Sequence, residues 1–404
     1  MQEEFLKEEC HHYFHLPNKP GPMMFRTQSF TGEEGSRYPA KKLPLKERAL
    51  VYCENEFGNI DGKVANGLVR FAERYEIVGV IDSTKTGLDA GEYLDGIKNG
   101  IPIFHNIDNA METLNYVPEY FIYGIAPLAS YLDKDQRNII TTAMRKGMDI
   151  VNGLPEFFTD DGEFVQNALD YNVKIYDVRK PPMRKDLHCF SGDITRVNIP
   201  VIIIVGTDCA VGKRTTTRCL VESLKKEGLN AVYIATGQTS LLQGSKYGIA
   251  LDVLTSGFAT GEVEKAVVDA FDTEHPDIII VEGQGALSHP AFTSSSAIIR
   301  GAMPNAIIIQ HPPKRKNHCD YPGLPMPTLE SEIELNEIFS GSKVIAITIN
   351  HEEMTDEEID KTITDYEMRY KLPTTDVLKN GCKKLINMLA VKFPEIGTKL
   401  EQLK

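Results

Sequence analysis

The chain has 404 residues, of which 42% are hydrophobic and 25% are charged. A chain of this length is expected to form about two or three domains, and its composition is typical of globular domains with apolar cores rather than of a disordered chain. The formal net charge of −13 argues against general binding to nucleic acids or to anionic membrane surfaces, because both require a positive field.

Cysteine usage and hydropathy indicate the compartment. The seven cysteines are scattered and include no CxxC pair, so neither a zinc ribbon nor a thioredoxin motif is predicted. Such an arrangement is typical of reduced thiols in a reducing compartment. The sequence shows no secretory signal pattern, and no apolar run approaches the ~20 residues of a membrane span. These observations predict a cytoplasmic protein that does not enter the membrane.

Residues 1–47 do not follow a regular domain pattern. They contain a close-set group of potential metal ligands, namely Cys10, His11, His12 and His15. A metal site needs three or four ligands in a fixed geometry, and no partner cluster for these residues is evident in the sequence. We expect instead an N-terminal arm that packs on the body of the protein or on another subunit, and for that reason we expect a homo-oligomer.

Residues 48–180 show strands that alternate with helices. Strands are expected at 49–53, 76–82, 101–104, 120–126, 148–153 and 174–179. This alternation predicts a doubly wound parallel sheet of the Rossmann-like class. The second strand ends at Asp82, an acidic residue that invites a dinucleotide-binding interpretation, but the GxGxxG fingerprint is missing because Gly58 and Gly62 are too far apart. Asp82 is therefore predicted to be a turn or cap residue, or a contact to some other ligand.

Residues 181–198 are predicted to form a basic linker between two domains. The segment and its N-terminal flank carry Arg179, Lys180, Arg184, Lys185 and His188. One interpretation is a solvated, proline-rich linker, and the other is a basic segment at an inter-domain cleft that binds phosphates or a substrate carboxylate. The planar guanidinium fork suits carboxylates, which makes Arg179 and Arg184 candidate substrate contacts. The position of the segment directly before a phosphate loop favours the second interpretation.

That phosphate loop lies in a strand–loop–helix pattern. The β-branched run 201–205 leads into a loop of small and polar residues that ends at Gly212-Lys213, where an amphipathic helix begins. Glycines let backbone N–H groups point inward, the helix N-terminus adds partial positive charge, and the lysine reaches the outer phosphates. The predicted cofactor contacts are Gly206, Thr207, Asp208, Cys209, Ala210, Val211, Gly212, Lys213, Arg214, Thr215 and Thr216.

The spacing within this loop departs from the usual motif. Five residues separate Gly206 from Gly212, so Thr207 stands where the first glycine is expected. Arg214 takes the place of the Ser or Thr that normally follows the lysine. A hydroxyl of Thr215 or Thr216 could still reach Mg²⁺, but the usual ligand position is lost. The context predicts phosphate binding and leaves nucleotide hydrolysis open.

Further candidate residues follow the later strands of residues 199–404. Strands are expected at 231–237 and 277–283, directly before His311, and at 343–350. Glu282, at the carboxyl end of its strand, is predicted to hold Mg²⁺ through a water or to act as a base, with capping of the next turn as the alternative. His289 is an acid–base candidate because its ordinary pKa lies near neutrality. Ser288 and His289 do not indicate a hydrolase, since no GxSxG elbow occurs.

Three more residues are predicted to contact the substrate. Gln238 opens a polar segment, 238–248, that is expected to be a ligand-contacting loop. Arg300 follows a serine-rich turn and is a candidate for binding a carboxylate. His311 opens a second basic loop, which continues with Lys314, Arg315, Lys316 and His318. We expect this loop to face the same ligand as the phosphate loop, because it too lies at the carboxyl end of a strand.

These motifs resemble known proteins. GTDCAVGK is similar to the variant phosphate loop of dethiobiotin synthetase, and so is the downstream strand that ends in VEGQG. The longer set GTDCAVGKRTTT, EGQGALSHP and IIQHPPKR resembles a bacterial family that joins a Rossmann-like domain to a phosphate-loop domain and includes D-glutamate N-acetyltransferases. The resemblance covers roughly residues 48–395 and is strongest from Arg179 to His318. It implies a P-loop NTPase-like fold for residues 199–404 and acetyl-CoA as a cofactor.

Together these observations predict two α/β domains that face each other across a cleft and bind a phosphorylated cofactor and a small carboxylate such as an amino acid. An acyltransferase would use Glu282 or His289 as base and Lys213 or backbone N–H groups as oxyanion donors. An ATP-dependent ligase or kinase would need Mg²⁺, held by Thr215 or Thr216 with Glu282 or Asp208. A non-catalytic nucleotide sensor is the third hypothesis. The missing hydroxyl after Lys213 and the resemblance both favour the transferase.

Overall fold

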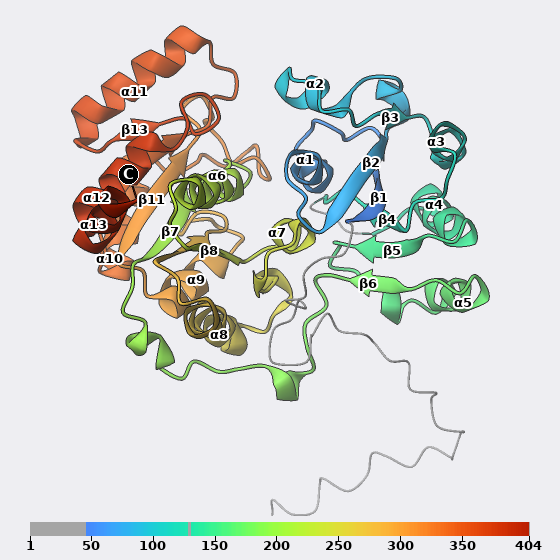
Figure 1. Ribbon diagram of the computed structural model, residues 1–404, viewed down its shortest axis with the longest axis horizontal. Helices are drawn as coiled ribbons and strands as arrows, with labels where there is room; N and C mark the ends of the chain where they lie inside the picture. The colour runs from blue at the N-terminus through green and yellow to red at the C-terminus, as the bar shows by residue number, and fades with distance from the viewer. Residues whose placement is uncertain (1–45, 128–130, 404) are drawn as a thin grey trace, which may run out of the picture. The chain divides into compact units, whose positions relative to one another are not determined.

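The computed structural model describes residues 46–127 and 131–403. The predicted N-terminal arm, with its cysteine and histidines, falls on residues outside this range except for its last two positions. The described residues form two parallel β-sheets with helices packed against them, so the predicted α/β class with two parallel sheets is confirmed (Figure 1). The limits proposed for the individual domains stay a prediction.

The first sheet has six parallel strands in the order β3-β2-β1-β4-β5-β6, which is the Rossmann order. Its strands are β1 (Glu47–Tyr52), β2 (Tyr75–Ile81), β3 (Ile103–Phe104), β4 (Tyr120–Tyr123), β5 (Asp149–Asn152) and β6 (Ile175–Asp177). Its helices are α1 (Lys63–Arg70), α2 (Ala90–Asp95), α3 (Ile107–Leu114), α4 (Lys134–Arg145) and α5 (Gly162–Asp170). Each of the six predicted strands is present. They could be predicted because parallel strands give continuous apolar runs in the sequence.

Asp82 lies directly after β2 and is fully buried. Its carboxylate accepts hydrogen bonds from the Thr84 N–H at 3.0 Å and from the Phe57 N–H at 3.2 Å, and Lys85 Nζ lies 2.9 Å away. Burial alone would raise the pKa of this carboxyl, but the bonds from Thr84 and Lys85 outweigh it and hold the pKa below its usual range. The expectation of a cap residue is thus confirmed.

The second sheet has seven parallel strands in the order β13-β12-β11-β7-β10-β8-β9. They are β7 (Val201–Gly206), β8 (Ala231–Ala235), β9 (Tyr247–Gly248), β10 (Ile278–Glu282), β11 (Ala306–His311), β12 (Val344–Ile349) and β13 (Thr374–Thr375). The central strand β7 pairs with β11 on one side and β10 on the other, with Ile204 opposite both Ile308 and Glu282. The ends of these three strands therefore meet at one edge of the sheet.

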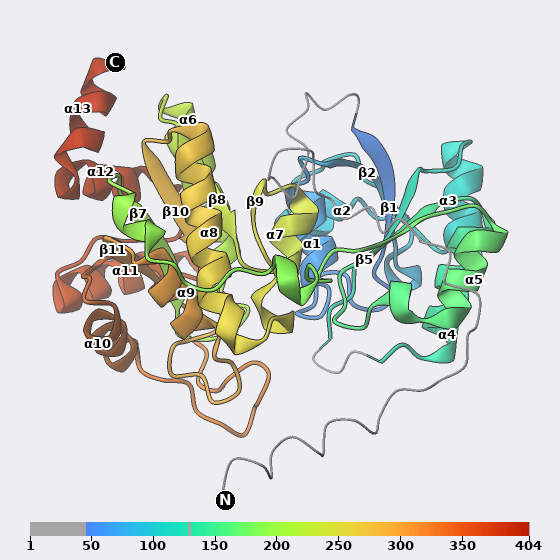
Figure 2. The ribbon, with the colours of Figure 1, turned by 90° about the horizontal axis from the view of Figure 1, so that it is seen from below.

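Helices cover both faces of the second sheet. They are α6 (Lys213–Lys226), α7 (Gln238–Gln243), α8 (Ser256–Glu274), α9 (Ser294–Ala302), α10 (Leu329–Ser340), α11 (Asp356–Tyr370), α12 (Lys383–Lys392) and α13 (Pro394–Gln402). Successive side chains of β7 pack in different apolar cores on the two faces of the sheet. Ile203 packs in the core with α8, α9 and α11, and Ile202 packs in the core with α6, α12 and α13. Figure 2 shows α8 running along its face of this sheet.

One prediction of local structure was wrong. The polar segment 238–248 is not a loop, since it contains α7 and β9, and most of its residues are buried. At the end of the described chain, Pro394 separates α12 from α13, because it lacks the N–H that a continuous helix would need. Among the described helices, none combines the length and the apolar character that crossing a membrane requires.

Contacts between α1 and α7 join the two sheet-bearing parts of residues 46–403. Gln243 Nε2 donates to the Gly67 carbonyl at 2.7 Å, and the Glu73 N–H donates to the Gln243 carbonyl at 2.9 Å. Arg214 Nη2 donates to the Lys63 carbonyl at 3.3 Å. The polar character of the segment 238–243, which suggested a ligand-contacting loop, is thus used in part for hydrogen bonds to the first sheet's helix.

The segment before β7 is fixed to α8 by a buried glutamate. The Glu264 carboxylate accepts hydrogen bonds from the N–H groups of Ser191, Gly192 and Ile194 at 2.6, 2.7 and 3.2 Å. A Cβ on Gly261, one turn earlier on α8, would lie 2.3 Å from the His188 carbonyl oxygen, so the linker passes directly over this glycine. The linker is therefore an ordered strap along α8 and not a freely solvated tether.

Glu264→Ala should lower the free energy of unfolding by about 3 kcal/mol, because it leaves several N–H groups without their acceptor. Urea-induced unfolding followed by circular dichroism measures this change. The control is Lys265→Ala, which removes an ion pair of Lys265 with Asp269 at the helix surface and should change the stability by about 0.5 kcal/mol or less. Equal effects of the two substitutions would contradict the assigned role of Glu264.

Candidate active site at the phosphate loop

The loop between β7 and α6 depends on two glycines. Gly212 adopts φ +102°, a conformation that side-chain-bearing residues rarely adopt. A Cβ on Gly206 would lie 2.9 Å from Val211 Cγ2 and 3.0 Å from Lys213 Cδ, so the lysine stem can pass over the loop only because residue 206 has no side chain. The five-residue spacing thus produces a closed loop with the lysine folded across it.

The start of α6 leaves backbone donors at the loop. The first N–H of this helix with an intrahelical bond is that of Thr216, which donates to the Gly212 carbonyl at 2.9 Å. The N–H groups of Lys213, Arg214 and Thr215 precede it and are not used by the helix. Unused N–H groups at the positive end of a fourteen-residue helix form a binding site for an anion such as a phosphate.

Lys213 adds the cation that such a site needs. The side chain is buried, and its Nζ donates to the Asp208 carbonyl at 2.5 Å. Burial lowers the pKa of Lys213 from its usual value. The ammonium group is therefore positioned within the loop by a main-chain oxygen and lacks a carboxylate partner among the described residues, which makes it available to an anionic ligand.

The hydroxyl groups near the lysine are mostly engaged in the protein. Thr216 Oγ1 donates to Gln310 Oε1 at 2.6 Å, and Thr217 Oγ1 donates to the Lys213 carbonyl at 2.8 Å. Arg214, in the usual position of the Mg²⁺-binding hydroxyl, directs its guanidinium to Lys63. Within the described residues only Thr215, of the three threonines that open α6, has a hydroxyl without a hydrogen-bond partner.

Glu282 ends β10 and is buried beside the start of α7. Its carboxylate accepts from Ser240 Oγ at 2.7 Å and from the Thr236 N–H at 3.2 Å. Burial raises the pKa of this carboxyl, although the charge of Arg214 opposes the rise. These contacts assign Glu282 a part in fixing the chain between β8 and α7, and its roles as base or as Mg²⁺ ligand with Thr215 stay predictions.

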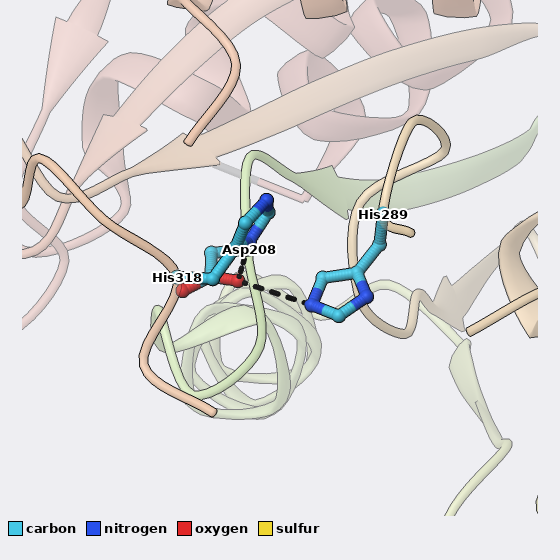
Figure 3. A group of neighbouring side chains, drawn as sticks. All are labelled: Asp208, His289 and His318. Carbon is cyan, nitrogen blue, oxygen red and sulfur yellow. Dashed lines mark hydrogen bonds and ion pairs between the residues drawn. The ribbon is translucent and has the colours of Figure 1, made fainter. Parts of the chain in front are cut away.

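Asp208 is the centre of a second set of contacts at the loop. Its Oδ1 lies 2.6 Å from His318 Nδ1 (Figure 3). Its Oδ2 accepts from Arg315 Nη1 at 3.0 Å and from the Cys319 N–H at 2.9 Å. Burial alone would raise the pKa of this carboxyl, but the bonds from His318, Cys319 and Arg315 outweigh it and lower the pKa. The carboxylate thus stays charged in a fully buried position.

His289 approaches the same carboxylate from the loop after β10. Its Nε2 lies 3.6 Å from Asp208 Oδ1, and its Nδ1 accepts a hydrogen bond from the Ala291 N–H at 3.2 Å. Burial, with His318 as the next cause, lowers the pKa of His289, so the ring is neutral near pH 7. Since Nδ1 is the acceptor, the ring proton is on Nε2, and His289 is a buried N–H donor that has no partner at hydrogen-bond distance among residues 46–127 and 131–403.

Two groups of side chains could hold a metal ion by proximity alone. Asp208, His289 and His318 form one, and Cys209 and Asp320 form the other, again with His289. A metal-binding histidine normally donates its second ring N–H to a neighbour, whereas Nδ1 of His289 accepts a hydrogen bond. The His318 Nδ1–Asp208 distance of 2.6 Å is also that of a hydrogen bond. The present geometry is a hydrogen-bonded network rather than a set of metal ligands.

His311 is the other predicted residue that reaches the loop. It ends β11, and its Nδ1 lies 2.9 Å from Thr207 Oγ1. Burial lowers the pKa of His311 to about 4, so the ring is neutral near pH 7. It also lines a cavity of about 320 Å³ together with Arg315, Lys316 and Tyr366. The predicted proximity of the second basic loop to the phosphate loop is thus present in the structure.

The structure does not bring the predicted arginines to this cluster. Arg179 forms an ion pair with Asp252 and donates to the Gly153 carbonyl at 3.3 Å. Arg184 is exposed, with its guanidinium 5.8 Å from the centre of the Phe258 ring. Arg300 is exposed in the last turn of α9, which leads back to the opposite edge of the sheet. Gln238 begins α7 and is half-buried.

Two residues of the network had no individual role in the sequence-based prediction. Arg315 and His318 were placed in the second basic loop, but nothing in their spacing indicates that both bind the same aspartate of the phosphate loop. The available signal was their position after a strand that neighbours β7, which only a strand order can supply.

Comparisons with known proteins identify the family. Residues 188–386 match a P-loop domain described as a domain of unknown function, DUF1611_C, and residues 83–181 match the Rossmann-like domain described as DUF1611_N. The chain belongs to the DUF1611 family. A DUF1611 family protein from Anabaena variabilis has a similar structure, with a TM-score of 0.78 and 29% identity, over 85% of this chain and 99% of that one.

Two curated relatives have names that state an activity. A protein from Pseudoalteromonas named D-glutamate N-acetyltransferase is 30% identical over 272 residues, which cover 66% of this chain and 80% of the relative. A protein of the same name from Tritonibacter scottomollicae is 27% identical over 278 residues, which cover 67% of this chain and 80% of the relative.

The pKa of about 4 for His311 predicts a pH-dependent stability. An unfolded histidine titrates near pH 6.5, so on acidification the unfolded state gains a proton before the folded state does. The free energy of unfolding should therefore fall by up to about 3 kcal/mol between pH 7 and pH 4 because of this residue. Thermal unfolding across this range measures the slope. His311→Asn should flatten it, whereas His105→Asn, at an exposed histidine, should leave it unchanged; identical slopes in both variants would refute the assignment.

Proposed function

We propose that this protein is an N-acyltransferase that transfers an acetyl group from acetyl-CoA to the amino group of a small amino acid, with D-glutamate as the first acceptor to test. The observation that carries the proposal is the phosphate loop with its unused N–H groups and the buried Lys213. In this loop Arg214 takes the position of the hydroxyl residue that normally binds Mg²⁺. Such a loop suits a phosphorylated cofactor whose phosphates are bound and not cleaved.

The names of the curated relatives support the same reaction. Both are D-glutamate N-acetyltransferases, and the matched 272 and 278 residues cover 80% of each relative. We infer that the loop residues 206–213 bind the pyrophosphate or the 3′-phosphate of acetyl-CoA. With the loop N–H groups used for the phosphates, the Nε2–H of His289 is the candidate donor for the oxyanion that forms when the amine attacks the thioester.

The acceptor site must supply a positive charge. An amino acid with a carboxylate needs a cation, and Arg179, Arg184 and Arg300 remain the candidates from the sequence. Of the two arginines that precede β7, Arg184 is exposed, whereas Arg179 is already paired with Asp252. We therefore expect Arg184 to contribute more to acceptor binding than Arg179.

An ATP-dependent ligase or kinase is the alternative. It would require Mg²⁺ held by Thr215 and Glu282, or by Asp208. Glu282 already accepts hydrogen bonds from Ser240 and Thr236, and Asp208 from three donors, so both carboxylates are engaged without an ion. This arrangement favours the transferase.

Calorimetric titration separates the two reactions. The protein should bind acetyl-CoA in the micromolar range without Mg²⁺, and Lys213→Ala should weaken this binding about ten- to a hundred-fold, because a charge-assisted bond in a buried site is lost. Release of free CoA thiol, followed with a thiol reagent, then tests D-glutamate, L-glutamate and other D-amino acids as acceptors.

The matched control is Lys225→Ala, which changes an exposed lysine in the last turn of the same helix. It should bind acetyl-CoA as the unmodified protein does. Binding of ATP with Mg²⁺ in the absence of acetyl-CoA binding would overturn the proposal and return the protein to the ligase or kinase class. Binding of acetyl-CoA without thiol release for any acceptor would instead indicate a sensor.

A further inference from the structure

Two histidines that follow β11 and β12 each place Nδ1 at the same distance from an aspartate carboxylate. His318 Nδ1 lies 2.6 Å from Asp208 Oδ1, and His351 Nδ1 lies 2.6 Å from Asp376 Oδ2. The aspartate of the first pair belongs to the phosphate loop, and that of the second pair follows β13 at the edge of the sheet. Only the first pair therefore belongs to the phosphate loop.

The tautomer of His318 follows from its partner. The Asp208 carboxylate can only accept hydrogen bonds, since its pKa lies below the usual range, so Nδ1 of His318 must carry the proton. The second ring nitrogen, Nε2, is then the one that can accept a proton. Within the described part of the chain Nε2 has no hydrogen-bond partner, and the ring is 4% exposed. His318 thus presents a free basic nitrogen in a site that excludes most water.

Asp208 is held so that it can fix this ring. Its second oxygen accepts from Arg315 Nη1 and from the Cys319 N–H, and Arg315 is itself paired with Glu352. The carboxylate cannot rotate away from His318 without breaking both bonds. An aspartate fixed in this way also stabilises the imidazolium that forms when the ring accepts a proton.

We propose that His318 is the general base of the acyl transfer and that Asp208 is its positioning residue; this inference rests on the proposed acyltransferase function. The acceptor ammonium first loses one proton to solvent. As its nitrogen forms the C–N bond, Nε2 of His318 takes the second proton. The C–S bond then breaks, and the imidazolium returns that proton to the departing CoA thiolate, so that one N-acetyl amino acid, one CoA thiol and one solvent proton result.

The other candidates for the base are less suited. Nε2 of His289 already carries a proton, because its Nδ1 accepts from the Ala291 N–H. Glu282 is engaged by Ser240 and Thr236. His289 is better placed as a donor: its ring lies 4.5 Å from that of His318 in an edge-on arrangement, so a donor and a base lie side by side.

Several charged or titratable groups surround the pair. Asp208 contacts Nδ1 of His318, and Arg315 contacts the far oxygen of that aspartate. The remaining neighbours, on the phosphate loop and on the loops after β10 and β11, are Lys213, Cys209, His289, Cys319, Asp320 and Tyr321. The charges of these groups all influence the protonation of His318, so the pH profile of a variant is compared with that of the unmodified protein.

The test uses the full chain and compares His318→Asn with His351→Asn. Asparagine keeps an N–H donor near the place of Nδ1 and removes the basic nitrogen. His318→Asn should lower kcat by about 100- to 10,000-fold, with the Kd for acetyl-CoA changed less than about threefold and the acidic limb of the kcat/KM profile abolished. His351→Asn should retain kcat and the acidic limb. Asp208→Asn should also lower kcat and shift the acidic limb, provided that thermal unfolding shows this variant to be folded.

Imidazole in the assay buffer provides a readout that a structural role would not give. It should restore part of the rate to His318→Ala and none to Lys213→Ala. The inference is overturned if the unmodified protein transfers acetyl groups but His318→Asn keeps more than about a tenth of kcat, retains the acidic limb, or fails only through lost acetyl-CoA binding. If the unmodified protein transfers no acetyl group, the proposed function itself is wrong, and the inference falls with it.

Discussion

The buried charge of Asp208 is the constraint on which the site depends. A carboxylate removed from water is unfavourable unless donors surround it, and here the donors are Arg315, His318 and the Cys319 N–H. All three come from the segment after β11, whereas Asp208 belongs to the loop after β7. Satisfying one charge therefore fixes the phosphate loop to the segment after the neighbouring strand, and the rings of His318 and His289 are held beside the loop.

The sequence predicted the fold well because the fold is expressed in local patterns. Continuous β-branched runs, separated by helices, identify both parallel sheets, and the loop that ends in Gly212-Lys213 marks the phosphate site. Arg315 and His318 could be assigned to a basic loop facing the ligand for the same reason. Their shared partner could not be derived, because contacts across more than 100 residues depend on the order of strands.

The wrong prediction for the segment 238–248 has a physical cause as well. Polar residues of the segment 238–248 suggested a ligand-contacting loop, but Gln243 and Ser240 form hydrogen bonds with buried groups of the protein. For Arg179 and Arg300 carboxylate binding stays a prediction, and in this structure their guanidinium groups are directed to Asp252 and to the face of the Phe339 ring. Residue type indicates which bonds a side chain can make, and only the structure shows whether the protein itself already makes them.

Arg214 has a consequence for how the two halves of the molecule depend on each other. It directly follows the lysine of the phosphate loop, yet its guanidinium donates to the Lys63 carbonyl at the start of α1. A truncated protein that begins near residue 199 would keep every residue of the loop but lose this acceptor. Its arginine would then be free to turn toward an anion at the loop, so the anion affinity of the isolated half would differ from that of the whole protein.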